Sequence, residues 1–182
     1  MGDTHIKIPA ELFAIAESSH FEGTWETEIL EAGPDDYRFQ EPVAWSVDVT
    51  NTGEALLVQG RAQANAVTAC ARCLEDVPCV LEGDLMGYFL LHEEAPAPDD
   101  LDDDEFDVLP ADHIIDLEPL IAAALLMDVF DVPLCKDDCL GLCPSCGANL
   151  NEGPCECGGD EALADFEEAA NPFAVLKSLD LS

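Results

Sequence analysis

Alternating apolar and polar residues predict three consecutive strands in the middle of the chain. Every second residue between 43 and 50 is apolar, which is the period of a strand with one buried face. A second such run covers residues 56–66 and a third covers 77–91, and the turn-forming sequence Asn51-Thr52-Gly53-Glu54 separates the first two. Strands joined by short connections favour an antiparallel meander. The predicted apolar faces consist of Val43, Trp45, Val47 and Val49, then Leu56, Val58, Ala62, Ala64 and Ala66, then Cys79, Leu81, Leu85, Phe89 and Leu91.

The stretch DLEPLIAAALLMDVF, residues 116–130, predicts a helix that is apolar on most sides. Asp116 is expected to be its N-cap, and Pro119 falls in the first turn, where a missing N–H removes no hydrogen bond. Pro133 should end this part of the chain. The apolar surface of such a helix has to be buried, and we expect it to pack against the sheet. The prediction is an α+β domain over residues 1–133.

Two further segments complete the predicted organisation. Residues 93–107 hold nine acidic residues, two prolines and no basic residue, which is typical of a solvated linker. A cysteine-rich segment follows at 134–158. Residues 159–182 predict a helical tail, with an acidic helix from Asp160 and a short final helix that Asn171 caps.

The charge balance narrows the choice of partner. The chain has 40 acidic and only 6 basic residues, a formal net charge of −34. Such a surface repels phosphate backbones, whose binding depends on Lys and Arg, so free RNA or DNA is a poor partner. A basic protein is a better one, because opposite fields accelerate encounter and fix orientation.

The N-terminal sequence and the apolar runs indicate a cytoplasmic protein. Residues 1–19 contain no basic run followed by an apolar stretch, so no secretory signal is expected. The longest apolar run, Leu120 to Met127, is far shorter than the roughly 20 residues that span a membrane. Thiols in the cytoplasm stay reduced, and closely spaced reduced thiols more often bind a metal than form a disulfide framework.

The nine cysteines include one strong metal-binding pattern. Cys143-Pro144-Ser145-Cys146-Gly147 has the form of a zinc knuckle, in which two intervening residues let both thiols face one ion and the glycine permits a tight turn. Cys155 and Cys157 supply two more thiolates. Four sulfur ligands with no open position favour a structural Zn²⁺ site.

Two further cysteine pairs each provide half a site. Cys135 and Cys139 precede the knuckle, and Cys70 and Cys73 lie between the second and third predicted strands. If these pairs meet, the chain holds two four-cysteine sites, and Cys79 remains as a small hydrophobic residue on a strand face. The spacing equally allows a different grouping around one ion, consisting of Cys135, Cys139, Cys143 and Cys146.

Catalytic interpretations of the cysteines have less support. Cys70 and Cys73 would suit a thiol-redox or metal-handling protein, with Arg72 lowering a thiol pKa, but redox pairs usually open a helix, whereas here strands flank the pair. The spacing from Cys139 to Cys146 matches radical iron–sulfur enzymes, yet the chain leaves no room downstream for their barrel. GxSxG, Walker and HExxH motifs are absent. We therefore expect no enzyme activity.

Several of these stretches together resemble the YceD family, the large ribosomal RNA subunit accumulation proteins. The GLCPxCGxNLN run is the most specific of them, and CxRCL alone would be weak. They occur in the family's order between residues 70 and 176, whereas the first forty residues add little. The stretches are Cys70-Ala71-Arg72-Cys73-Leu74, Ile115-Asp116-Leu117, Pro133-Leu134-Cys135, Cys139 to Gly147, Asn149-Leu150-Asn151 and Asn171 to Leu176.

The resemblance implies a bacterial or plastid-type cytosolic factor that supports accumulation of large-subunit ribosomal RNA in ribosome assembly. It implies no catalytic residues. Combined with the acidic composition, it predicts docking to a basic ribosomal protein or to an assembling particle, with weak or indirect RNA contact. Arg61, Arg72 and Lys136 are half of the basic residues and lie on or near the cysteine regions, so they are the first candidates for RNA contact.

Overall fold

The computed structural model describes residues 4–92, 94–95, 106–155 and 157 of the 182-residue chain. The described residues form two compact units. The first unit draws on Met1–Thr68 and Val77–Asp131, and the second on Ala69–Asp76 and Val132–Ser182. The connection between two long strands therefore belongs to the same unit as the cysteine-rich segment.

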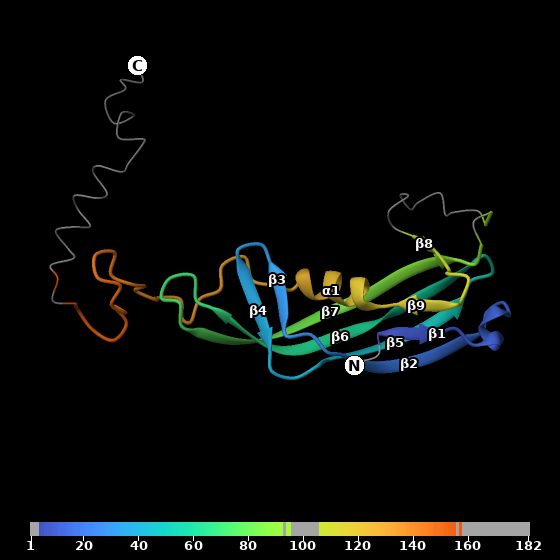
Figure 1. Cartoon of the computed structure of the whole chain (residues 1–182), viewed down its shortest axis with the longest axis horizontal. Helices are drawn as coiled ribbons and strands as arrows, with labels where there is room; N and C mark the ends of the chain where they lie inside the picture. The colour runs from blue at the N-terminus through green and yellow to red at the C-terminus, as the bar shows by residue number, and fades with distance from the viewer. Residues whose placement is uncertain (1–3, 93, 96–105, 156, 158–182) are drawn as a thin grey trace, which may run out of the picture. The chain divides into compact units, whose positions relative to one another are not determined.

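The three predicted strands are present and form the centre of a mostly antiparallel sheet (Figure 1). They are β5 (Val43–Asn51), β6 (Ala55–Ala69) and β7 (Asp76–Leu90). β5 and β6 are antiparallel, with Val49 opposite Val58, and β7 pairs with β6. The alternation of apolar residues thus identified these strands correctly.

The first forty residues contain strands that their sequence pattern did not predict. β2 (Ser18–Trp25) pairs with β5, and β4 (Asp35–Phe39) pairs with both β3 (Ile29–Ala32) and β6. The described sheet has the order β2-β5-β6-β4-β3, with β7 paired to β6 and β8 (Asp107–Val108) paired to β7. β2 and β4 carry few apolar residues and β3 has only four residues, so their alternation is weak. The remaining elements are β1 (His5–Lys7), η1 (Ala10–Phe13) and β9 (Ile114–Asp116).

The helix α1 (Glu118–Leu126) is shorter than the predicted 116–130. Asp116 is not the N-cap, because it belongs to β9, where it pairs with His5 of β1. Its carboxylate still accepts a hydrogen bond from the Glu118 backbone N–H at 3.0 Å. Pro119 lies in the first turn, as predicted.

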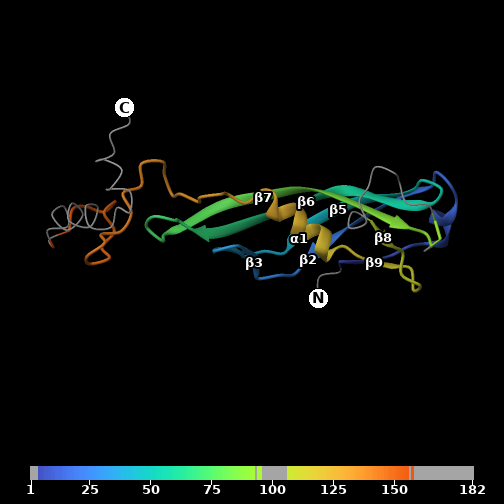
Figure 2. The same ribbon diagram turned by 90° about the horizontal axis from the view of Figure 1, so that it is seen from above.

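The helix α1 lies against the sheet (Figure 2). Ile121 and Leu125 are fully buried in the same cluster as the inward side chains of β5, β6 and β7. Gly83 of β7 permits the close approach, since a Cβ there would lie 2.5 Å from the Ala124 carbonyl group. Tyr37 of β4 is also fully buried, and its hydroxyl accepts a hydrogen bond from the Phe130 N–H at 3.1 Å.

Two predicted segments lie largely outside the described residues. Of the predicted linker 93–107, the structure describes only residues 94, 95, 106 and 107, and β8 begins at Asp107. The predicted helical tail 159–182 lies wholly outside them. Within the part of the chain that is described, no helix has the length and apolar character to cross a membrane.

Candidate metal centres

Eight cysteines of the second unit form two tetrads. Within each tetrad the four Sγ atoms all lie within 4.8 Å of one another. Site 1 consists of Cys70, Cys73, Cys135 and Cys139, and site 2 consists of Cys143, Cys146, Cys155 and Cys157. The structure thus selects the two-site grouping and not the single site that would have joined Cys135 and Cys139 to Cys143 and Cys146.

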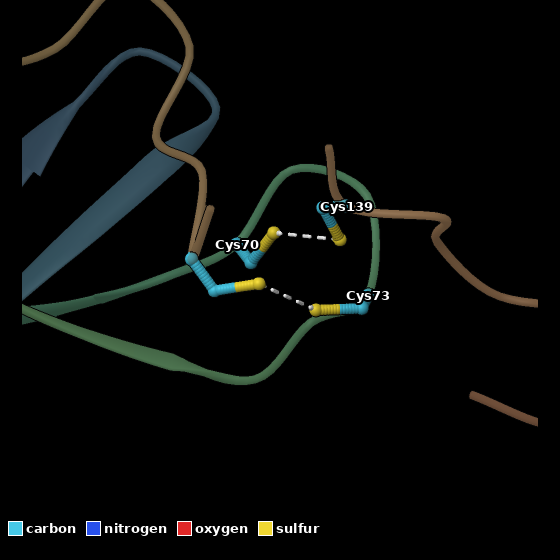
Figure 3. A group of neighbouring side chains, drawn as sticks. Cys70, Cys73 and Cys139 are labelled. Carbon is cyan, nitrogen blue, oxygen red and sulfur yellow. Dashed lines mark hydrogen bonds between the residues drawn. The ribbon is translucent and has the colours of Figure 1, made fainter. Parts of the chain in front are cut away.

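Site 1 joins two distant parts of the sequence. Cys70 and Cys73 lie in the tight connection between β6 and β7, where the Leu74 N–H donates to the Cys70 carbonyl at 2.9 Å. The Ala71 N–H donates to the Pro133 carbonyl at 2.8 Å, which brings the segment containing Cys135 to this connection. Figure 3 shows the thiols of Cys70, Cys73 and Cys139 pointing toward one another.

Site 2 is built on a short loop around the predicted knuckle. The Gly147 N–H donates to the Cys143 carbonyl, and the Cys143 N–H donates to the Ala148 carbonyl, both at 2.8 Å. Gly147 has a φ of +73°, a conformation that glycine adopts at little steric cost. The tight turn that the sequence predicted at this glycine is therefore present.

The sulfur–sulfur distances are too long for disulfides, and those of site 1 lie closest to the separation expected around a shared ion. In site 1, Cys70 and Cys139 are 3.8 Å apart and Cys73 and Cys135 are 3.5 Å apart. In site 2 the Sγ atoms of Cys143, Cys155 and Cys157 are 3.2–3.4 Å from one another. A disulfide bond is about 2.05 Å long. Sulfurs that bind one tetrahedral zinc ion at about 2.3 Å lie about 3.8 Å apart.

The thiols of site 1 differ in their readiness to ionise. Burial opposes ionisation of Cys70, but the backbone N–H groups of Cys73, Arg72 and Cys135 outweigh it and lower its pKa to about 6. Burial and the neighbouring thiols of Cys73 and Cys139 raise the pKa of Cys135 to about 12. Cys70 therefore ionises far more readily than Cys135.

The thiols of site 2 also differ in their pKa values. The backbone N–H groups of Cys146 and Ser145 lower the pKa of Cys143 to about 6. Hydrogen bonds with the thiols of Cys155 and Cys143 raise the pKa of Cys157 to about 12. In both tetrads backbone N–H groups face the sulfur of the first cysteine of the CxxC turn and lower its pKa.

The donor set of both tetrads fits a structural zinc ion. Each tetrad offers four sulfur atoms from the protein, which closes a tetrahedral shell and leaves no position for a substrate. Sulfur-only tetrahedral sites suit zinc or iron, and zinc is the usual occupant of isolated four-cysteine sites. Either ion would fix the geometry of the surrounding turns.

Asn149 and Asn151, which the sequence shows only as parts of a motif, lie beside site 1. The Asn151 side-chain amide donates to the Cys139 Sγ atom at 3.2 Å, and this hydrogen bond is the main cause of a lowered Cys139 pKa. The Asn149 amide donates to the Glu75 carboxylate at 2.8 Å, next to the turn that carries Cys73. Asn-x-Asn is a turn signal in sequence, but the contact with a ligand depends on the tertiary fold.

Cys79 belongs to neither tetrad. It is half-buried on β7, packs against the hydrophobic core, and lies with its Sγ atom 3.6 Å from the Ala66 carbonyl oxygen. Burial raises the pKa of its thiol, which favours the neutral form. This environment matches the predicted role as a small hydrophobic residue.

The three basic residues considered for RNA contact all have acidic or carbonyl neighbours. Arg61 is exposed on β6 and donates from Nε to Asp84 at 2.9 Å. The Arg72 guanidinium donates to the Cys139 carbonyl at 3.0 Å, and therefore helps to hold the site 1 loop. Lys136 Nζ lies 4.0 Å from an Asp138 carboxylate oxygen. RNA contact by these residues stays a prediction.

Comparisons with known proteins find several relatives of this chain. An uncharacterized protein of Mycobacterium tuberculosis (strain ATCC 25618 / H37Rv) is 35% identical over 106 residues, which cover 58% of this chain and 50% of the relative. A protein of Arabidopsis thaliana named large ribosomal RNA subunit accumulation protein YCED homolog 1, chloroplastic, is 27% identical over 153 residues, covering 69% of this chain and 47% of the relative. A Zea mays protein with the same name is 28% identical over 145 residues, covering 64% and 48%.

The chain thus spans about half the length of the curated relatives it matches. No solved structure matches it. The model of the family described as large ribosomal RNA subunit accumulation protein YceD matches residues 58–180, which include both cysteine tetrads. Because that match covers more than half of the 182 residues, this chain belongs to the YceD family.

Proposed function

We propose that this chain is a non-enzymatic factor that supports the accumulation of large-subunit ribosomal RNA during ribosome assembly, with one zinc ion in each cysteine tetrad. The observation that carries the proposal is the pair of closed four-sulfur sites within the part of the chain that matches the family. A closed shell supplies folding energy and no reactive position. In this role, zinc joins turns that the sheet alone does not hold together.

The proposed partner is a basic ribosomal protein or an assembling particle, met in the compartment where ribosomes assemble, which is the cytoplasm for a bacterial chain. A net charge of −34 attracts such a partner over long range and repels naked RNA. The acidic residues of 93–107 are part of that charge. Because exposed charges act mainly during encounter, they should affect the association rate more than the final affinity.

The thiol-redox alternative has less support from the geometry. A redox nucleophile needs access to its substrate, but Cys70, whose pKa is about 6, has 0% of its surface exposed. Its sulfur faces three further cysteines, as expected of a metal ligand. The lowered pKa therefore serves metal uptake in this proposal.

Complementation tests the role in assembly. Cells depleted of this protein should regain a normal ratio of large-subunit to small-subunit ribosomal RNA with the intact chain and with Cys79→Ala. A chain with Cys70→Ser and Cys143→Ser, which disables both tetrads, should fail although the protein is still made. A normal ratio in cells that lack the protein would refute the proposed function.

Affinity capture tests the partner. The intact chain and one whose acidic residues in 99–107 are replaced by Asn or Gln are each used to capture proteins at low and high salt, with and without nuclease. We expect basic ribosomal proteins at low salt that survive nuclease, slower association of the neutralised chain, and loss at high salt, because exposed charges are screened beyond about 8 Å at physiological ionic strength. Capture that nuclease abolishes and neutralisation strengthens would identify RNA as the true partner.

A further inference from the structure

Asn151 uses both ends of its side-chain amide at site 1. Its Nδ2 group donates to the Cys139 Sγ atom at 3.2 Å and to the Asn149 Oδ1 atom at 2.9 Å. Its Oδ1 atom accepts a hydrogen bond from the Leu140 backbone N–H at 3.0 Å. The side chain therefore fixes both the sulfur of one ligand and the backbone that follows this ligand.

The position of Asn151 in the chain links it to the other tetrad. It lies in the loop between Cys146 and Cys155, two ligands of site 2. That loop is short, and an isolated bridge pairs its Asn149 with Leu142, the residue that precedes Cys143. A metal ion at site 2 would close the loop at both ends and so restrict where Asn151 lies.

Further contacts attach Asn149 of this loop, and the two residues that precede Cys143, to the turn of site 1. The Asn149 amide donates to the Glu75 carboxylate at 2.8 Å, and the Leu142 N–H donates to the Arg72 carbonyl at 3.2 Å. A Cβ at Gly141 would lie 3.1 Å from that same Arg72 oxygen. Residues on both sides of the Cys143–Cys146 turn thus pack on the CxxC turn of site 1, in one compact unit.

We infer that Asn151 is a positioning residue that couples the two tetrads, so that metal bound at site 2 raises the metal affinity of site 1. The inference rests on the proposed metal sites. An ion at site 2 orders the loop, and the ordered loop presents the amide to Cys139 before site 1 is filled. The coupling is reciprocal, so metal at site 1 raises the affinity of site 2 by the same factor. Hydrogen bonds to metal ligands typically change affinity by roughly 10–100-fold.

A double-mutant cycle on the full chain tests the coupling. Site 2 is disabled with Cys146→Ser and Cys157→Ser, and the Zn²⁺ affinity of site 1 is measured by competition with a chromophoric chelator. We expect disabling site 2 to weaken site 1 by roughly tenfold with Asn151 present and by less than about twofold with Asn151→Ala. Asn65→Ala, a change of an exposed asparagine on β6, is the matched control and should keep the full coupling.

A conservative variant separates the amide donor from the rest of the side chain. Asn151→Asp keeps an oxygen for the Leu140 N–H but loses the donor to the Cys139 sulfur, so it should lower the affinity of site 1. With Co²⁺ in place of zinc, the sulfur-to-metal absorption of site 1 should shift in this variant, while that of site 2 should not. An unchanged affinity and spectrum would overturn the assigned role.

Amide exchange tests the coupling without altering Asn151. The Leu140 N–H should lose protection when site 2 is disabled, because its acceptor is then no longer held in place. Full protection of Leu140, or an equal affinity of site 1 with and without site 2, would refute the coupling. If both sites bind zinc independently, the coupling alone is wrong; if neither binds zinc, the proposed function fails with it.

Discussion

The two tetrads contain the same turn in different surroundings. In each, the residue after the second cysteine has a positive φ and donates its N–H to the carbonyl of the first cysteine, at 2.9 Å for Leu74 and 2.8 Å for Gly147. The first turn joins β6 and β7, each 15 residues long, whereas the second lies in a short loop. β6 and β7 can hold half of site 1 without metal, whereas no pair of strands flanks the site 2 turn among the described residues. We therefore expect the CxxC turn of site 2 to depend more strongly on bound metal than the CxxC turn of site 1.

The two turns also differ in backbone strain. Leu74 has a φ of +63°, which is unfavourable for a residue with a Cβ, and its side chain is 66% exposed. Gly147 adopts +73° without that penalty. Strain is tolerated where the surrounding structure fixes the backbone, as a paired hairpin does. The better-supported turn is thus the one that carries the unfavourable residue.

The largest expected contrast is between the loss of one ligand at each site. Cys143→Ala should remove one metal ion and the order of residues 141–155, so their amides should exchange at least about a hundredfold faster, while the sheet stays intact. Cys70→Ala should remove the other ion but leave β6 and β7 paired up to the turn. Amide exchange with metal analysis measures both. Equal loss of order in the two variants would contradict the view that the sheet supports the site 1 turn and that site 2 depends on metal.

Lowering the pH should weaken metal binding at both sites. The metal-bound tetrads hold thiolates, whereas the empty ones keep protons on Cys135 and Cys157, whose pKa values are about 12. Raising the pH therefore strengthens binding. Below about pH 6 the Cys70 and Cys143 thiolates also take up protons, so the affinity should fall more steeply there. Chelator competition from pH 8 to 5.5 measures this, and a flat profile would count against thiolate ligation.

Substitutions at the two positive-φ positions should change the stability of their turns in different directions. Both changes should be smaller than the loss of a metal ligand. Gly147→Ala should destabilise the site 2 turn by about 1 kcal/mol, since alanine is strained at this φ. Leu74→Gly should leave site 1 equally stable or stabilise it by less than about 1 kcal/mol, because relief of strain offsets the added freedom of the unfolded chain. Thermal unfolding of the zinc-loaded variants tests this. A strongly destabilised Leu74→Gly would show that the leucine side chain, and not the backbone, supports the turn.

Cys79 should give the smallest effect. Cys79→Val and Cys79→Ala keep the β7 side chain apolar and touch neither tetrad, so both variants should bind as much metal as the intact chain. The alanine variant should lose stability by about 1 kcal/mol for the space it leaves. Metal analysis of purified protein is sufficient, and any loss of metal would contradict the eight-ligand assignment.

The sequence predicted those features that depend on local pattern. β5, β6 and β7 have strong alternation, and the Cys143–Gly147 knuckle is defined by spacing alone. Three features could not be predicted in this way. The strands before residue 40 are short or show weak apolar alternation, Asp116 is drawn into β9 by pairing with His5, and Asn151 reaches Cys139 only through the tertiary fold. Pairing between distant segments decided each of these outcomes.

Metal content and coordination decide whether the two tetrads bind zinc. Protein purified under reducing conditions should contain two zinc ions per chain. X-ray absorption at the zinc edge should show about four sulfur neighbours at about 2.3 Å, with no nitrogen or oxygen ligand. A ratio of one or less, a mixed ligand shell, or an iron–sulfur spectrum would contradict the assignment of two structural four-cysteine zinc sites.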